Sequence, residues 1–248
     1  SSSSSSSSSS SCGEQRRHRP TVATWAEDFL RHVGSMDCTA ATTATTATAA
    51  TQAVLPLRGK ILNVASASAD KLAANQELSD LMQALGCGTR SDFDPNKLRY
   101  ERVIIMTDAD VDGAHIASLL MTFFFREMPG LIEGGNLFLA LPPLYRLSNG
   151  GTVAYARDDA HREEIMKTIF AGKTKVEVSR FKGLGEMDAK DLKQTTMDPK
   201  SRKLIRVSID EEQPGETVDL VDRLMGKKPE LRYQYIQSNA RFVNELDV

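Results

Sequence analysis

The sequence has few cysteines, no long apolar run and almost no net charge, and each shortage excludes a class of protein. Its 248 residues include three cysteines, which are widely spaced and form no CxxC pair, so neither a disulfide framework nor a zinc knuckle is indicated. Lys and Arg total 31 against 33 Asp and Glu, a formal net charge of −2. Such a balance gives no global field to attract DNA or anionic lipid, so any nucleic-acid surface must be local.

Membrane insertion is excluded by the same kind of shortage. The longest nearly apolar run, Ile116 to Phe125, is far shorter than the roughly 18 residues that indicate a membrane span. The N-terminus is polar where a signal peptide has an apolar core. We therefore expect a cytoplasmic protein with no membrane contact.

The first 51 residues differ in composition from the rest. Ser1 to Ser11 is an unbroken serine tract, and Thr39 to Thr51 contains only Ala and Thr. Neither tract has the apolar periodicity that burial requires. We assign no fold to residues 1–51 and interpret them as low-complexity or frame-shifted sequence, disordered in either case.

From Gln52 onward, strand-like and helix-like segments alternate, which indicates the α/β class. The pattern predicts a first domain over 52–150 and a second, mixed α/β subdomain over 151–248. A helix is expected over 69–85 with Gly86 as its stop, and a buried strand over 103–106. Further helices are expected directly after residue 113 and near 158–170, 216–225 and 229–242, and further strands over 137–141, 144–147, 153–156, 175–181 and 203–209.

The strongest local signal is the run Asp108-x-Asp110-x-Asp112-Gly113, which follows the predicted buried strand. Three carboxylates within five residues repel one another unless a cation neutralises them, and oxygen-only ligands suit Mg²⁺ or another hard cation such as Ca²⁺. In open α/β sheets, ligands bind beyond the carboxyl ends of the strands, which is where this run lies. We therefore predict a metal site formed by these three aspartates.

Two other structures could contain the same run. An EF-hand loop begins in the same way, but its twelfth position here is Leu119 rather than Glu, and the preceding segment is strand-like. A helix cap would explain one aspartate but not three. Mg²⁺ is usually completed by substrate phosphates, so the run suggests phosphoryl-transfer chemistry on a nucleotide or nucleic acid.

Four longer strings carry a resemblance to a known family. They are Leu55-Pro-Leu-Arg-Gly-Lys-Ile-Leu-Asn-Val64, Ile105-Met-Thr-Asp-Ala-Asp-Val-Asp-Gly-Ala-His115, Leu141-Pro-Pro-Leu-Tyr145 and Arg180-Phe-Lys-Gly-Leu-Gly-Glu-Met187. In this order, over residues 52–248, they resemble the C-terminal half of the B subunits of bacterial type IIA topoisomerases. Two strings, Asn63-Val-Ala-Ser-Ala-Ser-Ala-Asp70 and Gly113-Ala-His-Ile-Ala-Ser-Leu-Leu120, are more similar to the topoisomerase IV branch of this family than to gyrase.

The resemblance implies a fold and a set of roles. It implies a TOPRIM domain, a Rossmann-like α/β metal site, followed by a tail subdomain. Asp108 and Asp110 would bind Mg²⁺ (or Mn²⁺) and Asp112 would support the site. DNA-contacting positions would fall on Lys60, Asn63, His115 and Arg232, and the cleavage-region loop would contain Lys182, Gly183, Gly185 and Glu186.

The resemblance also implies partners. The nucleophilic tyrosine of the family belongs to the A subunit, so the chain would act on duplex DNA within a heterotetramer containing A subunits. ATP would be used only by the full-length family protein, whose ATP-binding and transducer domains do not match any segment here. We therefore expect no ATP hydrolysis by this chain.

One departure from the family concerns the first metal ligand. The family motif Glu-Gly-Asp-Ser-Ala-Gly-Gly is absent, and family spacing places Ser35 where its Glu would be. Two hypotheses follow: a component of a cleaving enzyme, which alone is inactive, or a non-catalytic remnant that binds DNA or a partner. A third class, the TOPRIM primases and nucleases, is disfavoured by the string Lys182-Gly-Leu-Gly-Glu186.

Overall fold

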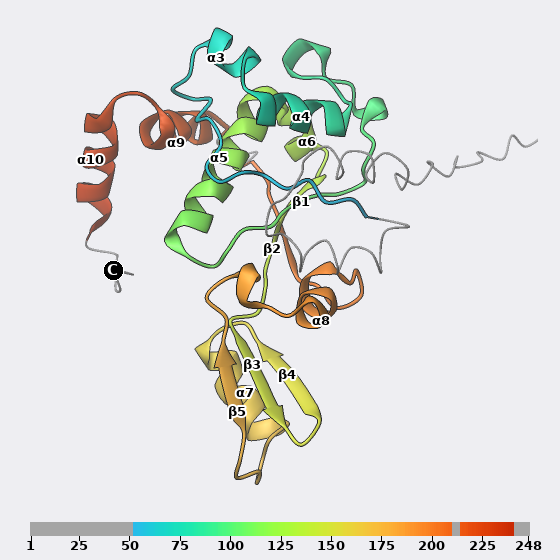
Figure 1. Ribbon diagram of the computed structural model, residues 1–248. Helices are drawn as coiled ribbons and strands as arrows, with labels where there is room; N and C mark the ends of the chain where they lie inside the picture. Colours follow the sequence, from blue (N-terminus) through green and yellow to red (C-terminus); the bar gives the residue numbers. More distant parts are fainter. Residues whose placement is uncertain (1–51, 210–213, 241–248) are drawn as a thin grey trace, which may run out of the picture.

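The computed structural model describes residues 52–209 and 214–240, which form two small sheets with helices around them (Figure 1). The first sheet contains β1 (Val103–Ile105), β2 (Leu137–Ala140) and β6 (Leu204–Arg206) in the order β1-β2-β6. Strands β1 and β2 are parallel, with Ile104 opposite Phe138, whereas β6 is antiparallel to β2. The predicted strand over 103–106 is confirmed apart from its last residue.

The connection from β1 to β2 is helical and supplies half of the buried residues of the core around the first sheet. It contains α5 (Val111–Glu127) and α6 (Pro129–Glu133). The apolar positions of α5 recur at helical spacing, so one face is buried. The buried core combines this face with α4, α6 and the strands, and its largest fully buried side chains include Leu78, Phe123, Phe124, Leu131 and Leu137.

The helix expected over 69–85 is wrong in one respect, because it is two helices. They are α3 (Ala69–Ala73) and α4 (Gln76–Leu85). The side chain of Asn75 accepts a hydrogen bond of 2.9 Å from the Leu78 amide, which starts a new helix. Asn favours such caps over helix interiors. Gly86 ends α4 with φ +70°, as predicted.

The second sheet is antiparallel and lies at the opposite end of the molecule from α3 and α4 (Figure 1). It contains β3 (Tyr145–Asn149), β4 (Thr152–Ala156) and β5 (Glu177–Arg180) in the order β4-β3-β5. Helix α7 (Asp159–Thr168) packs on it through Ile165. The division expected at residue 150 falls in the turn between β3 and β4, and β6 returns to the first sheet.

Short and C-terminal elements complete the described part of the chain. The short ones are η1 (Arg90–Asp92), η2 (Pro95–Lys97), η3 (Leu184–Glu186), α8 (Ala189–Leu192) and the π-helical η4 (Lys193–Met197). Helices α9 (Pro214–Met225) and α10 (Pro229–Asn239) extend to one side of the first sheet (Figure 1). Within the described ranges, none of the helices has the length and apolar character needed to cross a membrane.

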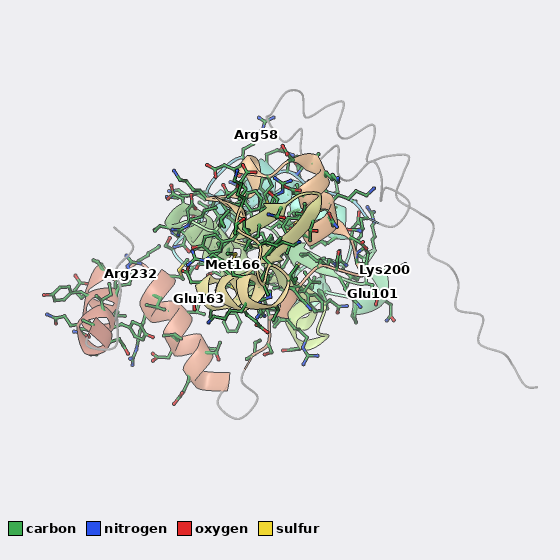
Figure 2. All side chains as sticks on the ribbon, turned by 90° about the horizontal axis from the view of Figure 1, so that it is seen from below. Arg58, Glu101, Glu163, Met166, Lys200 and Arg232 are labelled. Atoms are coloured by element: carbon green, nitrogen blue, oxygen red, sulfur yellow. The ribbon has the colours of Figure 1, made fainter. Side chains whose placement is uncertain are left out.

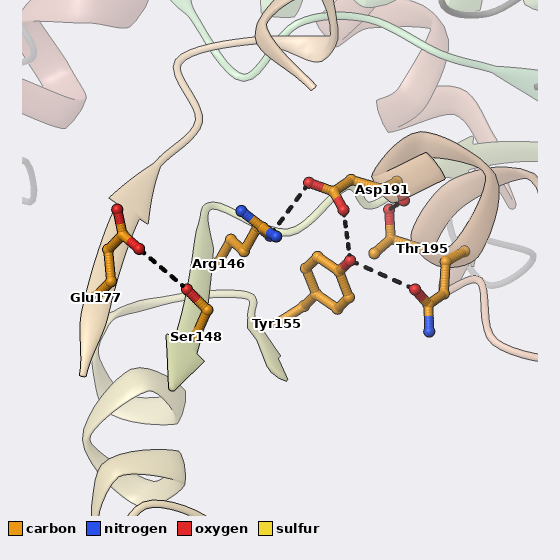
Figure 3. A network of polar contacts seen from close by, with 7 residues as sticks. Arg146, Ser148, Tyr155, Glu177, Asp191 and Thr195 are labelled. Carbon is orange, nitrogen blue, oxygen red and sulfur yellow. Dashed lines mark hydrogen bonds and ion pairs between the residues drawn. The ribbon is translucent and has the colours of Figure 1, made fainter. Parts of the chain in front are cut away.

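A polar network joins the second sheet to α8 (Figure 3). Asp191, buried on α8, accepts a hydrogen bond of 2.8 Å from the Tyr155 hydroxyl and forms an ion pair of 3.4 Å with Arg146 Nε. Burial and the contact with Asp191 raise the pKa of Tyr155 to about 12, so the hydroxyl remains a donor at neutral pH. The network fixes β3 and β4 against α8.

We expect Tyr155→Phe to lower the free energy of unfolding by about 2 kcal/mol, because a buried carboxylate loses a charge-assisted hydrogen bond. Denaturant unfolding measures the change. Tyr233→Phe is the matched control, because Tyr233 is exposed on α10 and its hydroxyl contacts only Gln237 among the described residues. Equal stability of the two variants would contradict the role assigned to this network.

Candidate metal and DNA site

The three aspartates of the predicted metal site lie between β1 and α5. Strand β1 ends at Ile105 and α5 begins after Asp110, so the carboxylates lie at the carboxyl end of a strand and the N-terminus of a helix. A helix N-terminus stabilises negatively charged side chains, and ligands of open α/β sheets bind beyond the carboxyl ends of the strands. The prediction that this run follows a strand and precedes a helix is confirmed.

Each aspartate has a different partner. Asp108 Oδ1 accepts a hydrogen bond of 2.7 Å from the Leu184 amide. Asp110 Oδ1 accepts one of 2.6 Å from the Gly113 amide and so caps α5. Asp112 Oδ1 lies 2.7 Å from Lys60 Nζ in an ion pair. Asp110 is therefore a helix cap, which is the role that the sequence analysis considered for one of the three aspartates.

The ion pair between Lys60 and Asp112 could not be found by inspecting the run itself. Lys60 is 52 positions before Asp112, yet it supplies the cation that the local sequence lacks. The Lys60 ammonium, with a smaller contribution from His115, holds the pKa of Asp112 below its usual range. Both partners are well exposed, so solvent screens the pair and its contribution to stability is small.

The remaining oxygen atoms fit a hard cation. Within the described ranges, Oδ2 of Asp108 and Oδ2 of Asp110 have no hydrogen-bond partner, and both side chains are exposed. Mg²⁺ needs only one or two protein carboxylates. In the part of the chain that the structure describes, however, no group of three His, Cys, Asp or Glu side chains gathers at ligand spacing. The donors thus fit Mg²⁺ in kind, with two carboxylates rather than three at the strand end.

Two glycines allow backbone to approach Asp108 closely. A Cβ atom on Gly113 would overlap the Asp108 carbonyl oxygen, and one on Gly183 would lie 2.7 Å from Asp108 Cγ. The sequence indicates Gly183 and Leu184 as members of the glycine-containing string 180–187, but it gives no indication that either residue contacts Asp108. No local signal could have found Leu184, because it contacts Asp108 across 76 positions through its backbone amide.

The predicted DNA-contacting residues divide into two groups. Lys60 and His115 are both exposed, and both act electrostatically on the Asp112 carboxylate. Asn63 Nδ2 donates to the Met225 carbonyl at 2.9 Å, and Arg232 donates to the Leu224 and Gly226 carbonyls. Asn63 and Arg232 therefore both contact the end of α9, and Arg232 is labelled in Figure 2. Ser35, the position predicted from family spacing for the Glu, lies outside the described residues.

Two domain families match the chain over these elements. The Toprim domain matches residues 34–140, which include β1, α5 and β2. The carboxyl terminus of the DNA gyrase B subunit matches residues 173–237, which include the loop that contacts Asp108, the whole of α9 and most of α10. The chain therefore matches a Toprim domain followed by the carboxyl terminus of a DNA gyrase B subunit. The Rossmann-like α/β fold predicted for the first of these is confirmed.

Curated relatives agree with the two domains. The chain is 63% identical over 197 residues to the B subunit of DNA topoisomerase 4 from Bartonella bacilliformis and 65% identical over 198 residues to that from Caulobacter vibrioides. The B subunit of DNA gyrase from Metamycoplasma hominis is 48% identical over 197 residues. In each case 79% of this chain is covered. The predicted resemblance, with topoisomerase IV ahead of gyrase, is confirmed.

The matched region is a limited part of these relatives. It spans 28% of the two topoisomerase 4 proteins and 30% of the gyrase protein. The chain therefore spans less than a third of the length of these relatives.

Proposed function

We propose that this chain supplies the metal site and part of the DNA surface of a type IIA topoisomerase B subunit. The observation that carries the proposal is the pair Asp108 and Asp110 at the carboxyl end of β1 within a Toprim domain, each with one oxygen left without a partner in the described ranges. In the intact protein, these carboxylates would act with an A subunit that carries the nucleophilic tyrosine. The reaction would be ATP-dependent double-strand passage in the bacterial cytoplasm.

The roles of the side chains follow from their contacts. Mg²⁺ held by Asp108 and Asp110 would stabilise charge on the phosphodiester oxygens during strand cleavage. The Gly113 amide orients Asp110, and the Leu184 amide orients Asp108. Asp112 binds Lys60 and so supports the site by holding a cation beside it. We propose that four side chains face the DNA backbone, namely those of Lys60, Asn63, His115 and Arg232.

We predict that duplex DNA binds this chain weakly and with strong salt dependence, since Lys60 would contact a phosphate. Each neutralised phosphate changes the slope of log K against log salt by about −0.9. Lys60→Ala should therefore reduce the slope by roughly one unit. Fluorescence anisotropy of a labelled duplex, titrated at salt concentrations between about 50 and about 200 mM, measures the slope for each protein.

Lys200→Ala is the control for the loss of one positive charge. Lys200 is exposed and lies on the opposite side of the molecule from Arg232 in Figure 2. Its removal should leave the slope unchanged. Equal slopes for wild type and Lys60→Ala, or sequence-specific binding that survives high salt, would contradict the proposed surface.

A second candidate function is a remnant that binds DNA or a partner but does not support cleavage. Two observations favour this remnant. Among the described residues, no three side chains that could bind a metal lie together, and within the described sheet β1 has a strand partner on one side only. Assignment to a gyrase rather than a topoisomerase IV is a weaker alternative, because identity to the gyrase relative is lower. The cleavage assay described in the Discussion separates the enzyme from the remnant.

A further inference from the structure

The loop formed by residues 182–186, called here the glycine loop, is anchored at both ends. Phe181 before it and Met187 after it are buried in a small core that also includes Met106, which directly follows β1. Inside the loop, the Lys182 amide donates to Glu186 Oε2 at 2.8 Å. The loop is therefore a closed unit fixed beside the end of β1, although it belongs to the C-terminal half of the sequence.

The contact between this loop and Asp108 is close and directional. The Leu184 amide donates to Asp108 Oδ1 at 2.7 Å. A Cβ atom on Gly183 would meet all three atoms of the Asp108 carboxylate, at 2.7 Å from Cγ, 2.9 Å from Oδ1 and 3.0 Å from Oδ2. Only a residue without a side chain permits this approach. The backbone of Gly183 is extended (φ −167°), so the need for glycine comes from space and not from conformation.

We propose that Gly183 and Leu184 are positioning residues for the Asp108 carboxylate. The Leu184 amide fixes Oδ1 and leaves Oδ2 for a cation, while Gly183 lets the amide come within reach. Carboxylates that bind metals are commonly held by such outer hydrogen bonds, whose loss costs about 10- to 100-fold in metal affinity. This inference rests on the proposed function, in which Asp108 binds Mg²⁺.

The test compares two glycines of the same loop. Gly183→Ala should push the Leu184 amide away from Asp108, reduce Mg²⁺ affinity by about 10-fold or more, and speed hydrogen exchange of the Leu184 amide. Gly185→Ala is the matched control, because a Cβ there would have nothing within 4 Å. It should leave both affinity and exchange unchanged. Titration calorimetry with Mg²⁺ and NMR of the metal-free chain supply the two measurements.

Asp108→Ala adds a variant in which the loop itself is unchanged. It should also speed exchange at Leu184, since the acceptor is lost. Unchanged affinity in Gly183→Ala, or the same loss in both glycine-to-alanine variants, would overturn the positioning role while leaving the metal site intact. If the wild-type chain binds no Mg²⁺, the proposed function fails, and the inference fails with it. Unchanged Leu184 exchange in Asp108→Ala would overturn the docking of the loop independently of metal.

Discussion

Replacing Asp108 and Asp110 together by asparagine is expected to lower the affinity for Mg²⁺ by about 100-fold or more, from a starting value in the millimolar to micromolar range. The change removes both charges with little change in shape. Asn keeps an oxygen that can accept from the Leu184 amide at position 108, and it is a good helix cap at position 110. The variant thus separates the charge of the carboxylates from their hydrogen bonds.

The control removes two charges elsewhere. Asp70 on α3 and Asp219 on α9 are both exposed, and Asp70→Asn with Asp219→Asn changes the net charge by the same amount. Mg²⁺ affinity in this control should equal that of the wild type. Calorimetry that finds equal affinity in the Asp108 and Asp110 variant would place the metal elsewhere.

The variant with asparagine at both Asp108 and Asp110 should be slightly more stable than wild type in the absence of metal. Repulsion between the carboxylates is relieved, and we expect a gain of about 0.5 kcal/mol. The gain is small because Asp112 is already paired with Lys60 and all three side chains are exposed. Local sequence alone suggests a larger repulsion, since it contains no cation near the run.

The elements around the site could be predicted because their signals are local. β1 is a short β-branched run, α5 has apolar positions at helical spacing, and Gly150 and Gly151 form the turn between β3 and β4. The helix expected over 69–85 was wrong because Asn75 starts a second helix. The preference of Asn for helix caps was the signal in the sequence from which this second helix could have been predicted.

The contacts that shape the site could not be predicted from the residues alone. Leu184 meets Asp108, Lys60 meets Asp112, and Asn63 meets Met225, each across more than 50 positions of sequence. The contacts of Leu184 and Met225 depend on how the C-terminal elements return to the first sheet, and β6 does so beside β2. The family resemblance supplied several of these residues as members of motifs, but not their contacts.

The second large effect expected concerns DNA cleavage. With an A subunit, Mg²⁺ and DNA, this chain is expected to support little cleavage, and a version with the family's Glu-Gly-Asp-Ser-Ala-Gly-Gly motif and its preceding strand in place of residues 30–41 should restore it. Family spacing places Ser35 at the position of the Glu, and a serine hydroxyl carries no charge to replace a carboxylate. Misplacement of a metal by about 1 Å can cost on the order of 100-fold in rate, so a difference of at least that size is expected.

The structure offers a place for such a strand. β1 pairs with β2 on one side, and no described strand pairs with its other side. A groove of about 1070 Å³ is lined by β1, by residues 52–57 and by the site residues Asp108 and Asp110. A strand placed along β1 would pair with the edge of β1 that has no strand partner among the described residues. A glutamate following that strand would then lie at the same edge of the sheet as the aspartates, because the carboxyl ends of parallel strands meet there.

The assay is quinolone-trapped cleavage, comparing this chain with the grafted version and with the same graft carrying Gln in place of the motif's Glu. The graft with Glu should cleave, and the graft with Gln should not, because it restores the strand without the charge. Cleavage by both grafts would show that the strand, rather than the carboxylate, is what the chain lacks. Equal cleavage by the ungrafted chain would instead assign the first ligand to a carboxylate within residues 52–248, and Asp112 would then be the residue to test, once freed from its ion pair with Lys60.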